Sequence, residues 1–154
     1  MSDAETRLKD LGLTLPEPMS PVATYAPYIV TGSLVFVSGQ ISINGEGELT
    51  TGKVGADLSI EEGQAAAKLC ALNLIAQVKD ACGGDLSRVK RVVKLGGFVN
   101  CGLDFADQPK VINGASDLMV AVFDDAGRQA RAAVGTPSLP FNVAVEVDAI
   151  FEID

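Results

Sequence analysis

Apolar and polar side chains alternate along the C-terminal end of the chain, and this pattern is the clearest structural signal in the sequence. A period of two places successive residues on opposite faces of a strand and predicts one buried face. The predicted core face carries Val143, Val145, Val147, Ala149, Phe151 and Ile153. The other face carries Glu146, Asp148, Ile150 and Glu152. Glu146 is therefore expected to point to solvent or to a second subunit.

A hairpin is predicted nearer the N-terminus. Residues 25–31 and 34–37 are rich in β-branched and aromatic side chains, and the Gly-Ser pair at 32–33 favours a short turn between them. Residues 38–40 are expected to end the second strand, and the Asn-Gly-Glu-Gly segment at 44–47 indicates a further turn.

Two helices are predicted in the middle of the chain, with a strand between them. The longer helix begins at the capping box of residues 59–62 and stops at the glycine pair 83–84. Residues 89–100 have the pattern of a mostly buried strand. The second helix is capped by Asp107, has Pro109 in its first turn and ends near Gly127. Its inner stripe consists of Val111, Ala115, Leu118 and Val122.

The order of these elements implies an α+β fold, a single mixed β-sheet with two helices packed on one face. A length of 154 residues is typical of a single domain, here 1–154. A short amphipathic helix over residues 4–10 and a proline-rich connection over 15–21 precede the hairpin. The sheet face that holds Ile150 has no helix to cover it, so we expect it to be buried against neighbouring copies.

The absence of histidine excludes several kinds of chemistry. Ser-His-Asp and Cys-His nucleophilic sites and the commonest zinc ligand sets all need that side chain, so no metal is expected. Cys70, Cys82 and Cys101 form no CxxC pair and are interpreted as small, reduced core residues.

The charge and the hydropathy of the chain limit its partners. A net charge of −8 repels a nucleic-acid backbone, and the basic segment at 88–94 is better explained as a solvated strand face. The N-terminus lacks a basic apolar leader, and no apolar run approaches the roughly 20 residues that a membrane helix needs. We expect a cytoplasmic protein that binds neither nucleic acid nor membrane.

Arg131 and Glu146 stand among apolar neighbours near the end of the chain. Arginine presents a rigid fork of donors that suits a carboxylate, and glutamate can hold or deprotonate a water. Together they would bind a small acid and hydrate it without a metal or a cofactor. The alternative is a structural ion pair between neighbouring strands, and the residues alone leave both open.

Several segments in order resemble the RidA (YjgF/YER057c/UK114) family, whose older name is endoribonuclease L-PSP. The resemblance runs from about Tyr25 to Ile153. Its segments are Gly32-Ser-Leu-Val-Phe-Val-Ser-Gly-Gln40, Ala65 to Asn73, Asp104-Phe-Ala-Asp107, Val111-Ile-Asn113, Ala130-Arg131-Ala-Ala-Val134, Leu139-Pro140 and Val145-Glu146-Val147.

The resemblance implies a chorismate-mutase-like homotrimer with three clefts between subunits. It also implies hydrolysis of reactive 2-imino or 2-enamino acids, such as 2-aminoacrylate, to 2-keto acids and ammonia, with no cofactor. By the same resemblance Arg131 binds the substrate carboxylate and Glu146 positions or activates the attacking water. The cleft would be lined by Tyr25, Asn113, Ser38, Gly39 and the backbone of Ala133.

The chain departs from the family in an N-terminal extension over residues 1–20 and in Ala133, where many imine deaminases have cysteine. Two other functions remain possible from the sequence. One is a non-catalytic, chaperone-like trimer in which Arg131 holds a metabolite carboxylate. The other, disfavoured by the acidity of the chain and the lack of histidine, is an endoribonuclease.

Overall fold

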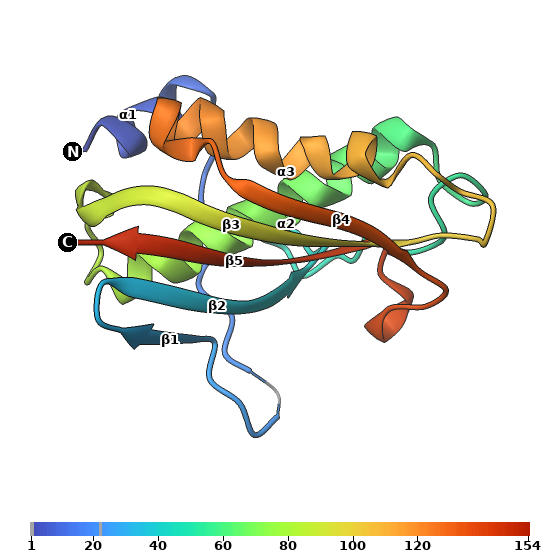
Figure 1. Ribbon diagram of the computed structural model, residues 1–154, viewed down its shortest axis with the longest axis horizontal. Helices are drawn as coiled ribbons and strands as arrows, with labels where there is room; N and C mark the ends of the chain where they lie inside the picture. The colour runs from blue at the N-terminus through green and yellow to red at the C-terminus, as the bar shows by residue number, and fades with distance from the viewer. Residues whose placement is uncertain (1, 22) are drawn as a thin grey trace.

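A mixed five-stranded sheet is the centre of the computed structural model, which describes residues 2–21 and 23–154 (Figure 1). The spatial order is β1-β2-β5-β3-β4, and only β3 and β4 run parallel. The strands are β1 (Tyr28–Thr31), β2 (Leu34–Ile41), β3 (Val89–Asn100), β4 (Ala130–Thr136) and β5 (Val145–Ile153). Isolated bridges, not a further strand, occupy the region between β2 and the next helix.

Helices α2 (Ile60–Ala81) and α3 (Gln108–Phe123) cover one face of the sheet, which confirms the predicted α+β arrangement (Figure 1). Helix α1 (Asp3–Asp10) packs beside α3. Three short 3-10 turns, η1 (Leu86–Arg88), η2 (Asp124–Gly127) and η3 (Pro140–Asn142), complete the elements. Within the described residues, no helix has the length and apolarity needed to cross a membrane.

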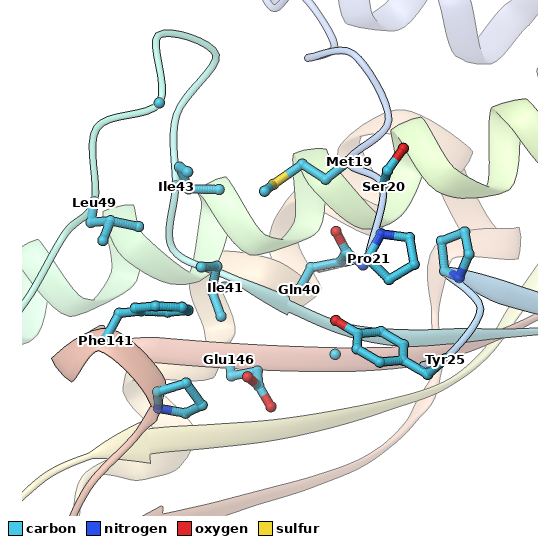
Figure 2. A pocket seen from close by; sticks show the side chains of 14 residues that line it. Met19, Ser20, Pro21, Tyr25, Gln40, Ile41, Ile43, Leu49, Phe141 and Glu146 are labelled. Atoms are coloured by element: carbon cyan, nitrogen blue, oxygen red, sulfur yellow. The ribbon is translucent and has the colours of Figure 1, made fainter. Parts of the chain in front are cut away.

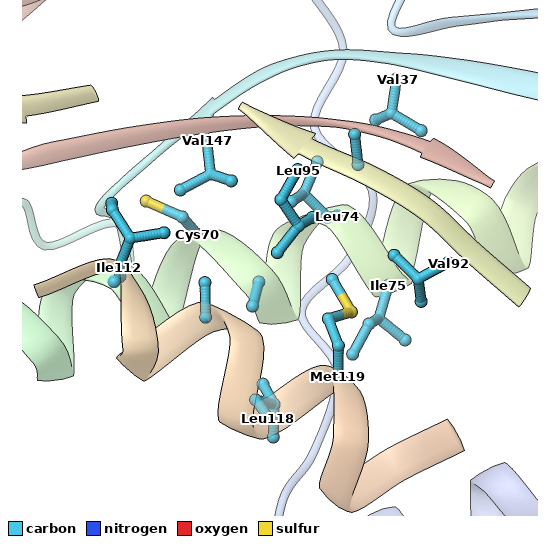
Figure 3. Packing of buried hydrophobic residues seen from close by; sticks show 14 of the residues in the cluster. Val37, Cys70, Leu74, Ile75, Val92, Leu95, Ile112, Leu118, Met119 and Val147 are labelled. Atoms are coloured by element: carbon cyan, nitrogen blue, oxygen red, sulfur yellow. The ribbon is translucent and has the colours of Figure 1, made fainter. Parts of the chain in front are cut away.

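The core lies between the sheet and the helix layer (Figure 3). The predicted inner face of β5 is buried throughout, and Val143, predicted with it, is buried just before the strand begins. Leu74 and Ile75 of α2, Met119 of α3 and Leu95 of β3 all belong to this core. The three cysteines are free and buried, and burial raises the pKa of the Cys70 and Cys82 thiols, in agreement with their interpretation as core residues.

The opposite face of the sheet carries an apolar row across three strands. Ile29 pairs with Phe36, and Phe36 pairs with Ile150, so these side chains lie side by side. Ile29 and Phe36 are exposed in the single chain. Lys94 of the predicted basic strand face lies next in register and is also exposed. This face is therefore available to a further protein surface.

The hairpin strands differ from the prediction at both ends. β1 begins at Tyr28 rather than residue 25, because Pro27 has no N–H for the strand ladder; its carbonyl instead accepts from the Ser38 N–H. β2 does not end at 38–40 but continues to Ile41. Val37 pairs with Ala149 and Gln40 with Val147, so two residues of β2 face one of β5 in a β-bulge.

The helix ends follow the predicted signals in part. The Ser59 hydroxyl accepts from the Glu62 N–H at 3.1 Å, but the Glu62 carboxylate accepts from that hydroxyl rather than from the backbone, so the box is half formed. α2 ends ahead of Gly83, as predicted. Asp107 is the N-cap of α3 without a side-chain cap bond. α3 ends at Phe123 rather than near Gly127, because the next residue has a φ of 57° and a 3-10 turn follows.

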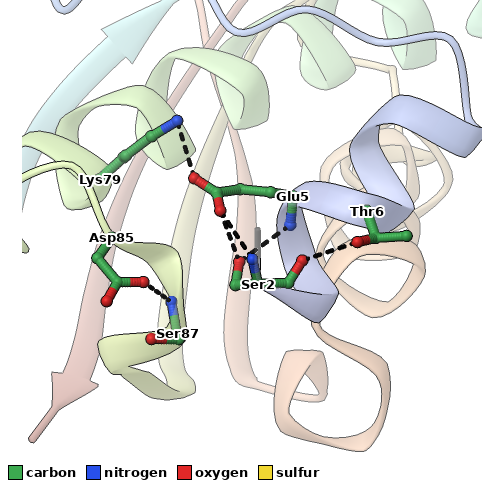
Figure 4. A network of polar contacts seen from close by, with 6 residues as sticks. All are labelled: Ser2, Glu5, Thr6, Lys79, Asp85 and Ser87. Atoms are coloured by element: carbon green, nitrogen blue, oxygen red, sulfur yellow. Dashed lines mark hydrogen bonds and ion pairs between the residues drawn. The ribbon is translucent and has the colours of Figure 1, made fainter.

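The predicted N-terminal extension, which the structure describes from residue 2, folds onto the helix layer. Its predicted helix, α1, opens with a capping box between Ser2 and Glu5 (Figure 4). Ala4 and Leu8 of this helix are buried. The Glu5 carboxylate also pairs with Lys79 of α2 at 3.0 Å. The Ser2 N–H and the Lys79 ammonium lower the pKa of Glu5 because both stabilise its ionised form. The extension is thus attached by apolar burial and by charge.

Candidate functional site

Arg131 lies on β4 in register with Leu95, and therefore on the helix side of the sheet. Its Nη1 donates to Asn113 Oδ1 at 2.8 Å and to Ser116 Oγ at 3.1 Å. These two residues are one turn apart on α3, so they present their oxygens on the same side of the helix. The contacts orient the guanidinium without neutralising it.

The structural alternative for Arg131 and Glu146, an ion pair between neighbouring strands, is wrong for the folded chain. β3 lies between β4 and β5, so the strands of the two residues are not neighbours. Among residues 2–21 and 23–154, no carboxylate lies within 4.0 Å of the Arg131 guanidinium. In the same residues, no ammonium or guanidinium group lies within 4.0 Å of the Glu146 carboxylate. Each charge is thus uncompensated by a direct partner in the part of the chain that the structure describes.

Glu146 lies on the open face of β5, between the buried Val145 and Val147, and borders a cavity of about 360 Å³. Tyr25 lines the same cavity (Figure 2). Gly39 lines it as well. The position of the Glu146 carboxylate depends on Gly39, because a Cβ there would lie 2.8 Å from Glu146 Oε2. Glycine at this point of the bulge leaves room for the carboxylate.

Burial raises the pKa of Glu146, and the negative charge of Asp148 raises it further. Both effects disfavour the ionised carboxylate, the first by removing water and the second by repulsion. A glutamate with a raised pKa is a stronger base when ionised than one in open solvent, which suits proton abstraction near neutral pH.

Gly39→Ala is expected to slow any reaction that uses the Glu146 carboxylate by about 10-fold or more while the free energy of unfolding changes little. The backbone of Gly39 has no positive φ, so alanine is tolerated there, but the carboxylate must move away from the new methyl group. Gly45→Ala is the matched control, because a Cβ at that position meets nothing within 4 Å. Steady-state kinetics and thermal unfolding of both variants check this expectation; equal kinetics in the two would contradict it.

The other predicted site residues join one or the other of these groups. Ala133, two residues after Arg131, pairs with Gly97 on the helix side. The Ser38 hydroxyl donates to the Ala26 carbonyl at 2.7 Å, which holds the loop that carries Tyr25. The structure thus brings Arg131, Asn113 and Ala133 together on one side of the sheet. It brings Tyr25, Ser38, Gly39 and Glu146 together on the other.

Some residues of the two groups were not predicted from the sequence to belong to a site. Ser116 contacts Arg131, and its spacing of three from Asn113 on a helix was the available signal. Asp148 shares a strand face with Glu146, and the alternation of β5 already placed it there. Phe141 lines the cavity from an irregular loop, where no pattern indicates it. In the described residues, no three His, Cys, Asp or Glu side chains gather in a way that would hold a metal ion.

Comparison with known proteins identifies one family over nearly the whole chain. The family model described as "YjgF/chorismate_mutase-like, putative endoribonuclease" matches residues 5–153, so residues 5–20 of the predicted N-terminal extension lie within the family match. Protein TCP17 of Trypanosoma cruzi is 49% identical over 148 residues, which cover 96% of this chain and 92% of that protein.

Two solved structures place the chain within the range of this fold. The crystal structure of protein Atu1372, of unknown function, from Agrobacterium tumefaciens has 51% identity and a TM-score of 0.91, covering 99% of this chain and 94% of that one. RidA from an Antarctic Psychrobacter has 28% identity and a TM-score of 0.61, covering 89% and 94%. The chain therefore shares its fold both with a protein of 51% identity and with a RidA of 28% identity.

Proposed function

This chain belongs to the YjgF/RidA family, and from that premise we propose that it hydrolyses reactive 2-imino or 2-enamino acids, such as 2-aminoacrylate, to 2-keto acids and ammonia. The family match confirms the resemblance that was found in the sequence, and it confirms the chorismate-mutase-like fold. One observation carries the proposal: Arg131 and Glu146 are both without a direct charge partner in the described chain, yet they lie on opposite sides of one sheet.

The separation of the two residues supports a site that is shared between subunits. We propose a homotrimer in which the Arg131 side of one copy meets the Glu146 side of the next, giving three clefts. The apolar row of Ile29, Phe36 and Ile150 supports the same assembly, because it is a surface that association would bury.

The proposed reaction needs no cofactor because the imine carbon is already electrophilic. The Arg131 guanidinium binds the substrate carboxylate through the donors that Asn113 and Ser116 leave free. Glu146 accepts a proton as a water oxygen attacks C2, and it returns that proton to the nitrogen. In the resulting amino alcohol, the hydroxyl proton then passes through the Glu146 carboxylate to the NH2 group as the C–N bond breaks, so that ammonia leaves and the carbonyl of the 2-keto acid forms.

The test measures imine decay and ammonia release when 2-aminoacrylate is generated beside the purified protein, with the mass of the protein measured by light scattering. We expect accelerated hydrolysis by a trimer. A trimer that binds 2-keto acids but never hydrolyses an imine would replace the proposal with the binding function. A monomer at micromolar concentration would contradict the shared cleft.

Two inactive variants provide a sharper test of the shared cleft. Mixed trimers of Arg131→Ala and Glu146→Gln chains contain one cleft with both native residues, whereas each variant alone contains none. We expect activity to return when the two are dissociated and reassembled together. No recovery despite mixed assembly would show that Arg131 and Glu146 act within the same chain.

The inherited description as an endoribonuclease is tested in the same preparation. We expect RNA cleavage no greater than that of an Arg131→Ala control, because a net charge of −8 gives RNA no counterion release. Arg131-dependent cleavage at near-physiological salt, without imine turnover, would reverse this assignment.

A further inference from the structure

The cavity beside Glu146 is far more apolar than a three-carbon substrate requires. Among the described residues that line it, only Glu146 and Tyr25 are ionisable (Figure 2). The side chains that form most of its walls are aliphatic, aromatic or prolyl, among them Met19, Tyr25, Ile43, Leu49 and Phe141. Such a surface holds water poorly and favours an apolar group.

Two of the cavity walls are fixed by a pair of buried amides on α2. Gln77, only 1% exposed, donates from Nε2 to the Met19 carbonyl at 2.8 Å. Asn73, one turn earlier, donates from Nδ2 to the Ile43 carbonyl at 3.0 Å. The N-terminal extension and the loop after β2 are thus attached to the same helix. The two buried NH2 groups have defined backbone acceptors, so these walls are built into the fold.

A third wall contains an aromatic residue in an unfavourable backbone conformation. Phe141 and Asn142 both have a φ of 57°, in the left-handed region that bulky residues avoid. Asn142 is held by hydrogen bonds from the Asn100 amide and from the Gly52 N–H, at 3.2 and 2.9 Å. This support keeps Phe141 at the cavity while it is 69% exposed in the single chain.

We propose that this cavity receives the side chain of the substrate, so that the preferred substrates are 2-imino acids with large apolar side chains, of leucine, methionine or phenylalanine size. The inference rests on the proposed function. C2 lies at Glu146, the carboxylate is bound by Arg131 of the adjoining copy, and the side chain extends between Met19, Leu49 and Phe141. A methyl or methylene group would leave most of the 360 Å³ to water.

The first experiment compares kcat/KM for 2-imino acids that an amino acid oxidase releases from alanine, leucine and phenylalanine. We expect the larger two to exceed the alanine product by about 100-fold, the discrimination available from a hydrophobic pocket. Calorimetry with 4-methyl-2-oxopentanoate and pyruvate gives a readout that does not depend on catalysis. Equal or reversed preferences in both measurements would overturn the inference. If the protein hydrolysed none of the imines but still bound 4-methyl-2-oxopentanoate more tightly than pyruvate, only the proposed hydrolysis would be excluded.

The second experiment fills the cavity. Leu49→Trp is expected to lower the ratio of large- to small-substrate kcat/KM by about 10-fold or more, whereas a fault in folding would lower both values together. Leu11→Trp is the matched control, because Leu11 has a similar exposure, 48% against 40%, and lies outside the cavity. Met19→Ala, which adds no bulk, should also lower the ratio because it removes a wall contact. An intact trimer with an unchanged ratio would overturn the inference, and so would loss of the trimer in Leu49→Trp alone, because it would show that a neighbouring copy fills the cavity.

Discussion

Arg131→Ala is expected to lower kcat/KM for imine hydrolysis by about 30- to 1,000-fold, because it removes a charged, bidentate contact to the substrate carboxylate worth about 2–4 kcal/mol once water is excluded. Arg131→Lys should lose most of the activity as well. Lysine keeps the charge, but it has no planar fork to bind Asn113 and Ser116 with one nitrogen and the substrate with the others.

Arg128→Ala is the matched control for the loss of a positive charge. Arg128 stands three residues before Arg131, and its guanidinium pairs on the surface with Asp125. The kinetics of Arg128→Ala should resemble those of the unmodified protein. If Arg131→Ala were equally unaffected, with fold and assembly intact, Arg131 would have a structural role only.

Glu146→Gln is expected to fold and assemble normally but to hydrolyse imines about 10²- to 10⁴-fold more slowly, while still binding 2-keto acids. Glutamine is nearly isosteric and can orient a water, but it cannot accept a proton. Glu152→Gln is the control, because Glu152 lies on the same face of β5 and pairs with Arg91 instead. If the Glu146→Gln protein did not fold, the role of Glu146 would be in the stability of the fold.

The pH dependence gives a second measurement of the role of Glu146. The base must be ionised, so activity falls as the pH drops through its pKa. Burial and Asp148 raise that pKa above the ordinary value of 4.5, and the acid limb should therefore lie above pH 4.5. Asp148→Asn removes the repelling charge, so the limb should move to lower pH. If the acid limb stayed at the same pH in Asp148→Asn, the group that titrates there would not be Glu146.

Alternation along a strand was sufficient to predict the orientation of Glu146. The inner face of β5 packs against the helices, so a residue between Val145 and Val147 must point the other way. Local signals also located α2 and β3. The glycine pair at 83–84 marked the end of α2, and a continuous apolar run marked β3.

The relation between Arg131 and Glu146 could not be predicted in the same way. It depends on the insertion of β3 between β4 and β5, which is a property of long-range pairing and leaves no local pattern. The cavity was missed for a related reason. Its walls come from the extension, the bulge, the loop after β2 and the turn at Phe141, and none of these has a periodic sequence.

Placing the two charged groups on opposite sides of one sheet makes catalysis a collective property in the proposed trimer. A newly synthesised chain would hold both groups and yet be inactive until it met two others. At protein concentrations low enough for the trimer to dissociate, the rate of imine hydrolysis would rise steeply with protein concentration, approaching its third power. The abundance of the protein, rather than an effector, would then set the threshold at which imine removal begins.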